Sequence, residues 1–301
     1  MLVQILNVVI KKKWKKKKMI KLGLIGYPLS HSLSAVIQNS ALKALNIDAE
    51  YQILETEPES LVDRIKYLRS RDFLGFNVTI PLKVPITLFL THVDAVANIA
   101  GCANTVKILP DKSMIGYNTD VYGFQKAIDN ETKNLIKNSK VSIVGAGGAA
   151  RACAVALAQS NVTEMDFYVR NIINASNTVN IIRDNFPDIS INLKQIQNLN
   201  DLSDSKMLVN TTPLGMRGKA MDLSPVTDKI LKTMPKDSTV YDIVYNPVNT
   251  ILIQQAKANA LKTITGLDML IFQAAKAIEI WTGKVPDTSL MKIAALESLN
   301  T

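Results

Sequence analysis

The sequence predicts an α/β protein of two domains, and three observations favour this fold class. Apolar segments of strand length alternate with segments whose apolar residues recur at helical spacing. This alternation is typical of parallel strands that are joined by crossover helices. A second alternation of the same kind begins near residue 140. The chain has 301 residues, which suits two domains of ordinary size.

The first domain is predicted to span residues 19–119. Its helices carry apolar residues on one face, and Pro58 suits the first turn of its second helix. After the third strand we expect a hairpin that turns at Pro110-Asp111. The predicted segments are the strands 20–26, 49–55 and 73–79, the helices 34–47 and 58–70, and the hairpin 105–120.

The second domain is predicted over residues 120–265, and residues 266–301 are predicted to return to the first domain as helices. Helical patterns occupy residues 268–281 and 287–298. The segments that indicate strands in the second domain are KVSIVGAGG (140–148), MDFYVR (165–170), KMLVNTTP (206–213) and STVYDIVY (238–245).

Composition excludes several classes of protein. Hydrophobic residues make up 47% of the chain and charged residues 20%, which indicates a soluble globular protein rather than a disordered one. No apolar run reaches the ~18 to 20 residues that span a bilayer. Cys102 and Cys153 are too few for a disulfide framework, which favours the cytoplasm. Neither cysteine has metal-ligand spacing with His31 or His92, so we expect no metal site.

Most of the positive charge lies at the N-terminus. The net charge is +9, and residues 1–18 contain seven lysines and no acidic residue, which leaves +2 for the remainder. This balance argues against nucleic-acid binding by the folded body. We predict that residues 1–18 form a disordered basic extension, with a true start at Met19 as an alternative. Contact of the lysines with anionic lipid or RNA is a second alternative.

The stretch VSIVGAGGAARACAVALA is the most specific local signal in the chain. An apolar strand runs into Gly145-x-Gly147-x-x-Ala150, and a helix follows. In this context the pattern indicates a dinucleotide site, because Gly145 permits the tight turn and Gly147 lets the backbone approach a pyrophosphate. The helix N-terminus then offers free N–H groups to the phosphates. A tight strand–helix turn without a ligand is the alternative.

The end of the next strand indicates which cofactor is bound. An NAD site needs Asp or Glu there to hold the ribose 2′-hydroxyl, whereas this chain offers Arg170 and Asn171, and Asp166 lies near the strand's start. A guanidinium can clasp a 2′-phosphate with its planar fork. The sequence therefore favours NADP, with Arg170 as a plain surface charge as the alternative.

Lys83 stands in NVTIPLK, just beyond a predicted strand. A lysine at a strand end is most often a solvated surface group, and that is the alternative here. Ligands of parallel sheets, however, bind in the crevice at the carboxyl ends of the strands. This position makes Lys83 a candidate for the chemistry.

Nine short stretches, in this order, resemble the shikimate dehydrogenase family from about Met19 to the C-terminus. They are GYPLSHSLS (26–34), NVTIPLK (77–83), GCANT (101–105), GYNTD (116–120), GAGGAAR (145–151), NTTPLGM (210–216), YDIVYNP (241–247), GLDML–FQ (266–273) and WTG (281–283). The resemblance implies a substrate domain followed by a Rossmann-like domain. It also implies the reversible reduction of 3-dehydroshikimate to shikimate by NADPH, on the chorismate route to aromatic amino acids.

The resemblance also implies roles for individual residues. Lys83 is expected to be the catalytic acid and base, paired with Asp120. The expected substrate-binding residues are Ser32, Ser34, Thr79, Asn104, Tyr245 and Gln273. The expected cofactor-binding residues are Gly145, Ala146, Gly147, Gly148, Ala149, Arg170, Asn171, Ile243 and Gly266.

The pairing of Lys83 with Asp120 makes chemical sense without the family. Reducing a ketone requires a hydride on carbon and a proton on oxygen, and a lysine can donate that proton. A nearby carboxylate fixes the lysine and favours its charged form. Asp120 as the N-cap of a helix beginning at VYGFQKAI is an alternative compatible with this role.

Several positions depart from the family's usual pattern. Proline and, three residues later, histidine are common after the second serine, where this chain has Ala35 and Gln38. Glutamine at the second position also suits relatives that use quinate. The usual Asn-Arg-Thr signature reads Val169-Arg170-Asn171, and a frequent second arginine is Asn174. A quinate/shikimate dehydrogenase that uses NAD therefore stays an alternative.

A catalytically silent sensor of nucleotides or metabolites is an alternative from another class of protein, and the presence of Lys83 and Asp120 argues against it. His31 is interpreted as a structural polar residue at a helix start. We expect a monomer or homodimer whose partner is its small-molecule substrate.

Overall fold

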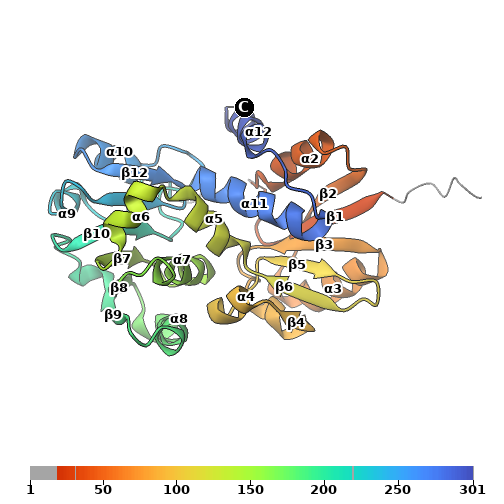
Figure 1. Ribbon diagram of the computed structural model, residues 1–301, viewed down its shortest axis with the longest axis horizontal. Coiled ribbons are helices and arrows are strands. Elements are labelled where there is room, and N and C mark those ends of the chain that lie inside the picture. The colour runs from red at the N-terminus through yellow and green to blue at the C-terminus, as the bar shows by residue number, and fades with distance from the viewer. Residues whose placement is uncertain (1–18, 31, 219, 301) are drawn as a thin grey trace, which may run out of the picture.

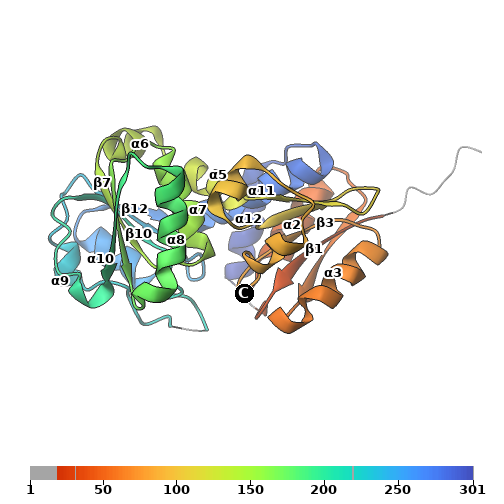
Figure 2. The same ribbon diagram turned by 90° about the horizontal axis from the view of Figure 1, so that it is seen from below.

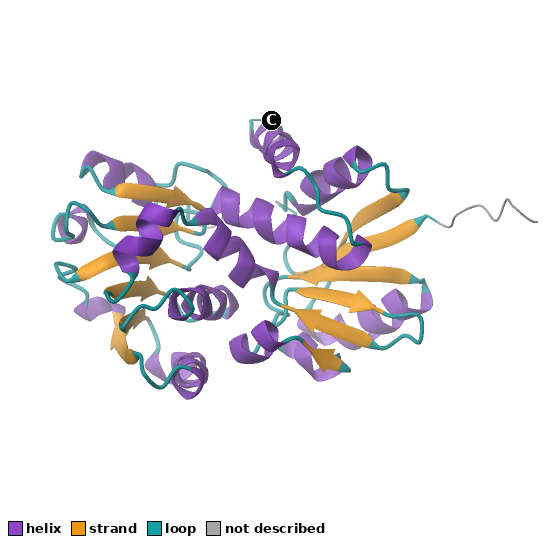
Figure 3. Ribbon diagram, viewed as in Figure 1, coloured by secondary structure: helices purple, strands orange, loops and turns teal. Residues whose placement is uncertain are grey.

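The computed structural model describes residues 19–30, 32–218 and 220–300. The basic extension predicted for residues 1–18 and the role predicted for His31 lie outside these residues. Two six-stranded sheets lie side by side along the longest axis, each flanked by helices (Figure 1 and Figure 3). The predicted α/β class is thereby confirmed.

The first sheet has the strand order β2-β1-β3-β5-β6-β4. The first three strands pair in parallel, as the alternation predicts. The pairing of β5 with β6 is antiparallel and confirms the hairpin, so the whole sheet is mixed. Its strands are β1 (Ile20–Gly26), β2 (Ala49–Glu55), β3 (Phe73–Val78), β4 (His92–Val93), β5 (Thr105–Ile108) and β6 (Met114–Tyr117).

The second sheet has the order β12-β11-β10-β7-β8-β9 and is parallel throughout. The order reverses at β7, so the crevice for a ligand is expected beyond the carboxyl ends of β7 and its neighbours. Its strands are β7 (Lys140–Val144), β8 (Glu164–Val169), β9 (Ser190–Gln195), β10 (Ser205–Asn210), β11 (Thr239–Asp242) and β12 (Lys262–Thr265).

Helices cover both faces of each sheet. The α-helices are α2 (Ser34–Ala44), α3 (Leu61–Ser70), α4 (Ala95–Ala100), α5 (Thr119–Ala127), α6 (Asn130–Ile136), α7 (Gly148–Ala158), α8 (Ile172–Asn185), α9 (Asp228–Leu231), α10 (Ile251–Ala258), α11 (Gly266–Thr282) and α12 (Thr288–Leu299). Short 3₁₀ helices are η1 (Pro58–Ser60), η2 (Pro85–Phe89) and η3 (Ile196–Asn198). None of these described helices is long and apolar enough to cross a membrane.

Each sheet separates two hydrophobic cores because successive side chains of a strand point to opposite faces. In β1, Leu22 and Leu24 belong to the core under α2, α11 and α12, whereas Ile25 belongs to the core under α3. The second sheet divides its cores in the same way, with α7 on one side and α10 on the other.

Helices α5 and α11 lie between the two sheets in both views (Figure 1 and Figure 2). They approach closely at Gly123, where a Cβ atom would lie 2.6 Å from the carbonyl oxygen of Met269. Only a glycine allows this approach. The two helices therefore tie the sheets together.

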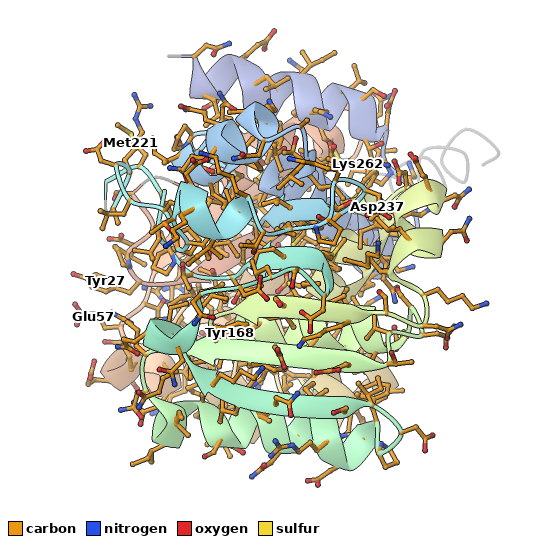
Figure 4. The ribbon with its side chains drawn as sticks, turned by 90° about the vertical axis from the view of Figure 1, so that its left-hand side faces the viewer. Tyr27, Glu57, Tyr168, Met221, Asp237 and Lys262 are labelled. Carbon is orange, nitrogen blue, oxygen red and sulfur yellow. The ribbon has the colours of Figure 1, made fainter. Side chains whose placement is uncertain are left out.

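The carboxyl ends of β1 and of the strands of the second sheet face one side of the molecule (Figure 4). Tyr27 and Met221, which follow β1 and β10, project on that side in Figure 4. Asp237 and Lys262, at the amino ends of β11 and β12, lie on the opposite side. The ends where the predicted site residues stand are thus on a common side.

Two local predictions need correction. The helix predicted over residues 34–47 ends at Ala44, because Asn46 adopts the left-handed conformation with φ 52°, which asparagine tolerates and which ends a helix. The N-cap of α5 is Asn118, whose side chain accepts from the Val121 amide. Asp120 as an N-cap is therefore wrong, since it stands inside the first turn.

Asp242, the last residue of β11, is a fully buried carboxylate. One oxygen accepts from Asn210 Nδ2 (2.9 Å) and from the Val244 amide (3.0 Å), and the other accepts from the Thr250 hydroxyl (2.6 Å). These bonds join the ends of β10 and β11 to the N-cap of α10. Burial raises the pKa of Asp242 to about 6, although the hydrogen bonds oppose the shift.

We expect the stability that Asp242 contributes to fall as pH rises from about 4 to about 6. Its pKa in the folded state lies above the ordinary value of 3.8, so the folded protein holds this proton more tightly than the unfolded chain does. Asp242→Asn cannot ionise. In urea denaturation, the free energy of unfolding of the wild type relative to this variant should fall by up to about 3 kcal/mol between pH 4 and pH 7. A difference that does not change with pH would contradict this account.

Candidate active site

Lys83 and Asp120 form a buried ion pair at the boundary between the two sheets. Lys83 lies in the turn after β3, and Asp120 lies in the first turn of α5. Their Nζ and Oδ2 atoms are 2.6 Å apart, and the side chains are 14% and 9% exposed. Burial alone lowers the pKa of Lys83, but the charge and hydrogen bond of Asp120 outweigh it and the pKa lies above its usual value. Lys83 is therefore held as an ammonium group that can donate a proton.

Asn104 holds the other oxygen of this carboxylate. Its Nδ2 donates to Asp120 Oδ1 (2.8 Å), and its Oδ1 accepts from the Thr119 amide (2.7 Å). The second bond fixes which end of the amide faces Asp120, since Oδ1 can only accept and Nδ2 can only donate. Gln273 from α11 joins the group, because its Oε1 accepts from Asn104 at 3.3 Å.

A buried polar network continues behind Asn104. Asn77 Nδ2 donates to the Asn104 carbonyl (3.1 Å) and to the Thr105 hydroxyl (2.9 Å). Asn77 Oδ1 in turn accepts from Tyr51 (2.7 Å) and Gln38 (3.3 Å). Sequence reasoning missed the role of Asn77, although the residue begins NVTIPLK, because nothing local shows which face of β3 it occupies.

Tyr245 belongs to the same neighbourhood from the second sheet. Burial raises its pKa, and the nearby positive charge of Lys83 partly opposes the shift. Because Tyr245 follows β11, this predicted residue extends the group around Lys83 across the boundary between the sheets.

Ser32 and Ser34 lie at the start of α2, where the Ser34 amide donates to Ser32 Oγ at 3.3 Å. Thr79 directly follows β3, and its carbonyl accepts from the Leu82 amide at 2.8 Å. Among the described residues, no hydrogen bond joins these three side chains to the Lys83–Asp120 pair. The three residues lie near the carboxyl ends of β1 and β3, but their hydrogen bonds do not connect them into one site.

The turn between β7 and α7 has the form that a dinucleotide requires. Gly145 has φ +104°, and a Cβ there would lie 2.5 Å from Thr211 Oγ1, so only glycine fits. A Cβ on Gly147 would meet nothing within 4 Å, which leaves open space over the turn. The free N–H groups at the start of α7, near Gly148 and Ala149, suit a phosphate group.

Lys83 is seated against this turn. A Cβ on Gly148 would lie 3.4 Å from Cδ of Lys83. The Cys102 thiol also lies 3.8 Å from the Gly148 carbonyl oxygen. The Lys83 side chain and the dinucleotide turn are therefore adjacent.

The end of β8 carries positive charge and no free acid. Arg170 is exposed directly after β8, and Asn171 caps α8 by accepting from the Asn174 amide (3.0 Å). Asp166 is fully buried and pairs with Lys194 at 2.7 Å, so it is not available to a ribose. These residues fit a 2′-phosphate better than a 2′-hydroxyl.

Ile243 and Gly266 lie against each other at the turn after β11. A Cβ on Gly266 would overlap the Ile243 carbonyl, and the Gly266 amide donates to the Val244 carbonyl at 3.3 Å. The start of α11 is thus fixed on the strand end that carries Tyr245. Within residues 19–30, 32–218 and 220–300, no cluster of three His, Cys, Asp or Glu side chains could hold a metal ion.

The two sheets, the dinucleotide turn and the lysine–carboxylate pair define a two-domain nicotinamide-dependent dehydrogenase. Residues 24–106 match the family model of the shikimate dehydrogenase substrate-binding domain, and residues 266–296 match that of the shikimate 5′-dehydrogenase C-terminal domain. A shikimate dehydrogenase (NADP⁺) of Methanococcus maripaludis is 37% identical over 283 residues, which cover 92% of this chain and 97% of that protein. The chain belongs to the shikimate dehydrogenase family.

Solved structures agree with this assignment. The shikimate 5-dehydrogenase of Thermus thermophilus, in complex with NADP(H) and shikimate, has a TM-score of 0.80 and 32% identity over 93% of this chain and all of that one. A quinate dehydrogenase of Corynebacterium glutamicum in complex with NAD has a TM-score of 0.83 and 28% identity over 92% and 99%. The fold is therefore shared by enzymes with different cofactors.

We expect Gly147→Ala to weaken NADP binding without changing stability. The added methyl group meets no protein atom within 4 Å, but it projects into the space over the turn where the pyrophosphate must approach the backbone. The dissociation constant for NADP, from fluorescence titration, should rise about tenfold or more, which is ~1.4 kcal/mol. Thermal melting without ligand serves as the control. If the affinity for NADP is unchanged, the pyrophosphate does not bind at this turn.

Proposed function

We propose that this chain catalyses the reversible reduction of 3-dehydroshikimate to shikimate with NADPH. The observation that carries the proposal is the buried Lys83–Asp120 pair seated against Gly148 of the dinucleotide turn. A proton donor beside a dinucleotide site is what reduction of a ketone requires. The names of the relatives and the ligands in their structures support the choice of substrate and cofactor.

In this proposal NADPH, when bound, supplies the hydride. Lys83 donates a proton from Nζ to the carbonyl oxygen and takes it back in the reverse direction. Asp120 holds the ammonium group in place, and Asn104 holds Asp120. Because the site is largely buried, these charged contacts are stronger than they would be in water.

The remaining predicted residues bind and orient the ligands in this proposal. The hydroxyls of Ser32 and Ser34 hold the substrate carboxylate, while Thr79, Tyr245 and Gln273 complete the substrate site. The cofactor is held by the turn of residues 145–149, by Arg170 and Asn171 at its 2′-phosphate, and by Ile243 and Gly266.

We assign residues 19–119 and 266–301 to the substrate domain and residues 120–265 to the dinucleotide domain. The packing of α11 and α12 against α2 supports the return of the C-terminal helices to the first domain. We further propose that the enzyme acts in the cytoplasm as a monomer or homodimer.

The decisive experiment compares four reactions of the purified protein: shikimate and quinate, each with NADP and with NAD. We expect the highest kcat/KM with shikimate and NADP. A preference for quinate with NAD would instead indicate a quinate dehydrogenase. Gln38, where histidine is common in the family, is the residue that suggests this alternative. Binding of ligands without turnover would indicate a sensor.

Lys83 should act on the chemical step. Lys83→Ala should lower kcat by about 10² to 10⁴-fold, the usual contribution of a positioned proton donor, with NADP binding retained. Lys83→Arg should not restore the rate, because a guanidinium stays protonated. The Lys83→Ala, Asp120→Asn double variant should be far less damaged than the product of the singles, since the two act as a unit. Steady-state kinetics on folded variants measures this, and near-normal kcat in Lys83→Ala would refute the assignment.

Arg170 should set the choice of cofactor. Arg170→Ala should raise KM for NADP by about ten- to a hundred-fold, the cost of a lost charge-assisted hydrogen bond of roughly 1.5 to 3 kcal/mol. KM for NAD should stay nearly unchanged, since NAD lacks the 2′-phosphate. The measurement is kcat and KM with both cofactors. An equal loss with NAD and NADP would show that Arg170 does not contact the 2′-phosphate.

A further inference from the structure

Arg151, the fourth residue of α7, is a buried arginine held by neutral oxygens. It is 6% exposed. Its Nη1 donates to the Gly101 carbonyl (3.1 Å), and its Nε donates to the Thr178 hydroxyl (3.1 Å). Among the described residues no carboxylate forms an ion pair with it, and burial lowers its pKa. A buried charge without a counter-ion is costly, so its presence needs a reason beyond packing.

The two contacts of Arg151 lead to the two halves of the site. Gly101, with φ +60°, ends α4 and begins the segment that carries Asn104. Thr178 lies in α8, and its hydroxyl donates to the Ala146 carbonyl (2.8 Å) in the dinucleotide turn. One guanidinium therefore joins the segment that orients Asp120 to the turn that receives the cofactor.

The same segment meets the turn at a second point. Cys102 Sγ lies 3.8 Å from the Gly148 carbonyl oxygen. The Cys102 backbone carbonyl accepts from Asn118 Nδ2 (3.1 Å). Gly101 also lies close to α8 and to the guanidinium, because a Cβ there would lie 3.0 Å from Ile181 and 3.1 Å from Arg151 Nη1. Through these contacts, a displacement of the dinucleotide turn is expected to act on residues 101–104.

We propose that Arg151 is a positioning residue that couples the two ligand sites, so that the bound cofactor strengthens the binding of shikimate and shikimate strengthens the binding of the cofactor by the same factor. Reciprocity is required by thermodynamic linkage. A ligand that orders the shared segment removes part of the ordering cost for the second ligand. This inference rests on the proposed function.

The geometry requires arginine rather than any cation. Nη1 and Nε address partners on two different elements at the same time, and the planar fork holds them in fixed relation. Lysine at this position keeps the charge but has a single amino group. Arg151→Lys therefore separates charge from geometry, whereas Arg151→Met removes both and keeps a side chain of similar length.

Calorimetric titration of shikimate, with and without saturating NADPH, measures the coupling. These two ligands are both reduced, so the ternary complex does not react. The wild type should bind shikimate at least about fivefold more tightly with NADPH present, within the usual range of coupling between sites. Arg151→Met and Arg151→Lys should bring this ratio close to one, as should Thr178→Val, while Thr178→Ser should keep it.

Arg183→Met is the matched control. Arg183 lies in α8 and also donates to a backbone carbonyl, that of Ile191 (2.6 Å), but this carbonyl belongs to the edge strand β9. The Arg183→Met variant should leave the ratio of shikimate affinities with and without NADPH unchanged. If Arg151→Lys weakens both ligands and keeps the ratio, or if the wild type shows no coupling, the proposal is overturned. A wild type that binds NADPH but not shikimate would overturn the proposed function and this inference with it.

Discussion

The ion pair between Lys83 and Asp120 is the interaction on which the site depends. Two charges can be withdrawn from water only if their remaining lone pairs and protons find partners. The second oxygen of Asp120 accepts from Asn104, whose side-chain oxygen Oδ1 accepts from the Thr119 amide. Asn77 then ties the Asn104 backbone to β3. A chain of buried hydrogen bonds thus supports the pair from behind and runs into the first sheet.

The pair also fixes how the two sheets must meet. Asp120 stands on α5, which packs along α11 with a glycine at the point of closest approach. Lys83 follows β3 of the first sheet, and a Cβ on Gly148, at the start of α7, would lie 3.4 Å from its Cδ. A shift between the sheets would either stretch the 2.6 Å contact or move the lysine off the turn. Close packing of α5 and α11 opposes such a shift, since packed interiors deform little.

The second sheet uses a different device to hold its strand ends. The buried carboxylate of Asp242 accepts hydrogen bonds from Asn210 in β10, from the Val244 amide in the turn after β11, and from Thr250 at the start of α10. This arrangement fixes the segment that carries Ile243 and Tyr245. A buried acid therefore lies near the predicted site residues of each sheet: Asp120 has a cation as its partner, whereas Asp242 has neutral donors.

By itself the sequence determined the features that local physics controls. Strong apolar runs predicted β1, β3, β7 and β10, and the glycine pattern predicted the dinucleotide turn, because conformation and spacing decide these within a few residues. The edge strands β9 and β12 were not predicted, since they are half-exposed and lack a clear apolar pattern.

Only the tertiary structure decided which polar groups meet. Lys83 and Asp120 are 37 residues apart, and their pairing could be expected from a resemblance to a family but not from spacing. The N-cap of α5 is Asn118 and not Asp120. The hydrogen bond from Arg151 to Gly101 joins positions 50 residues apart. Hydrogen-bond partners of buried side chains depend on the relative placement of whole elements, which no local pattern of residues contains.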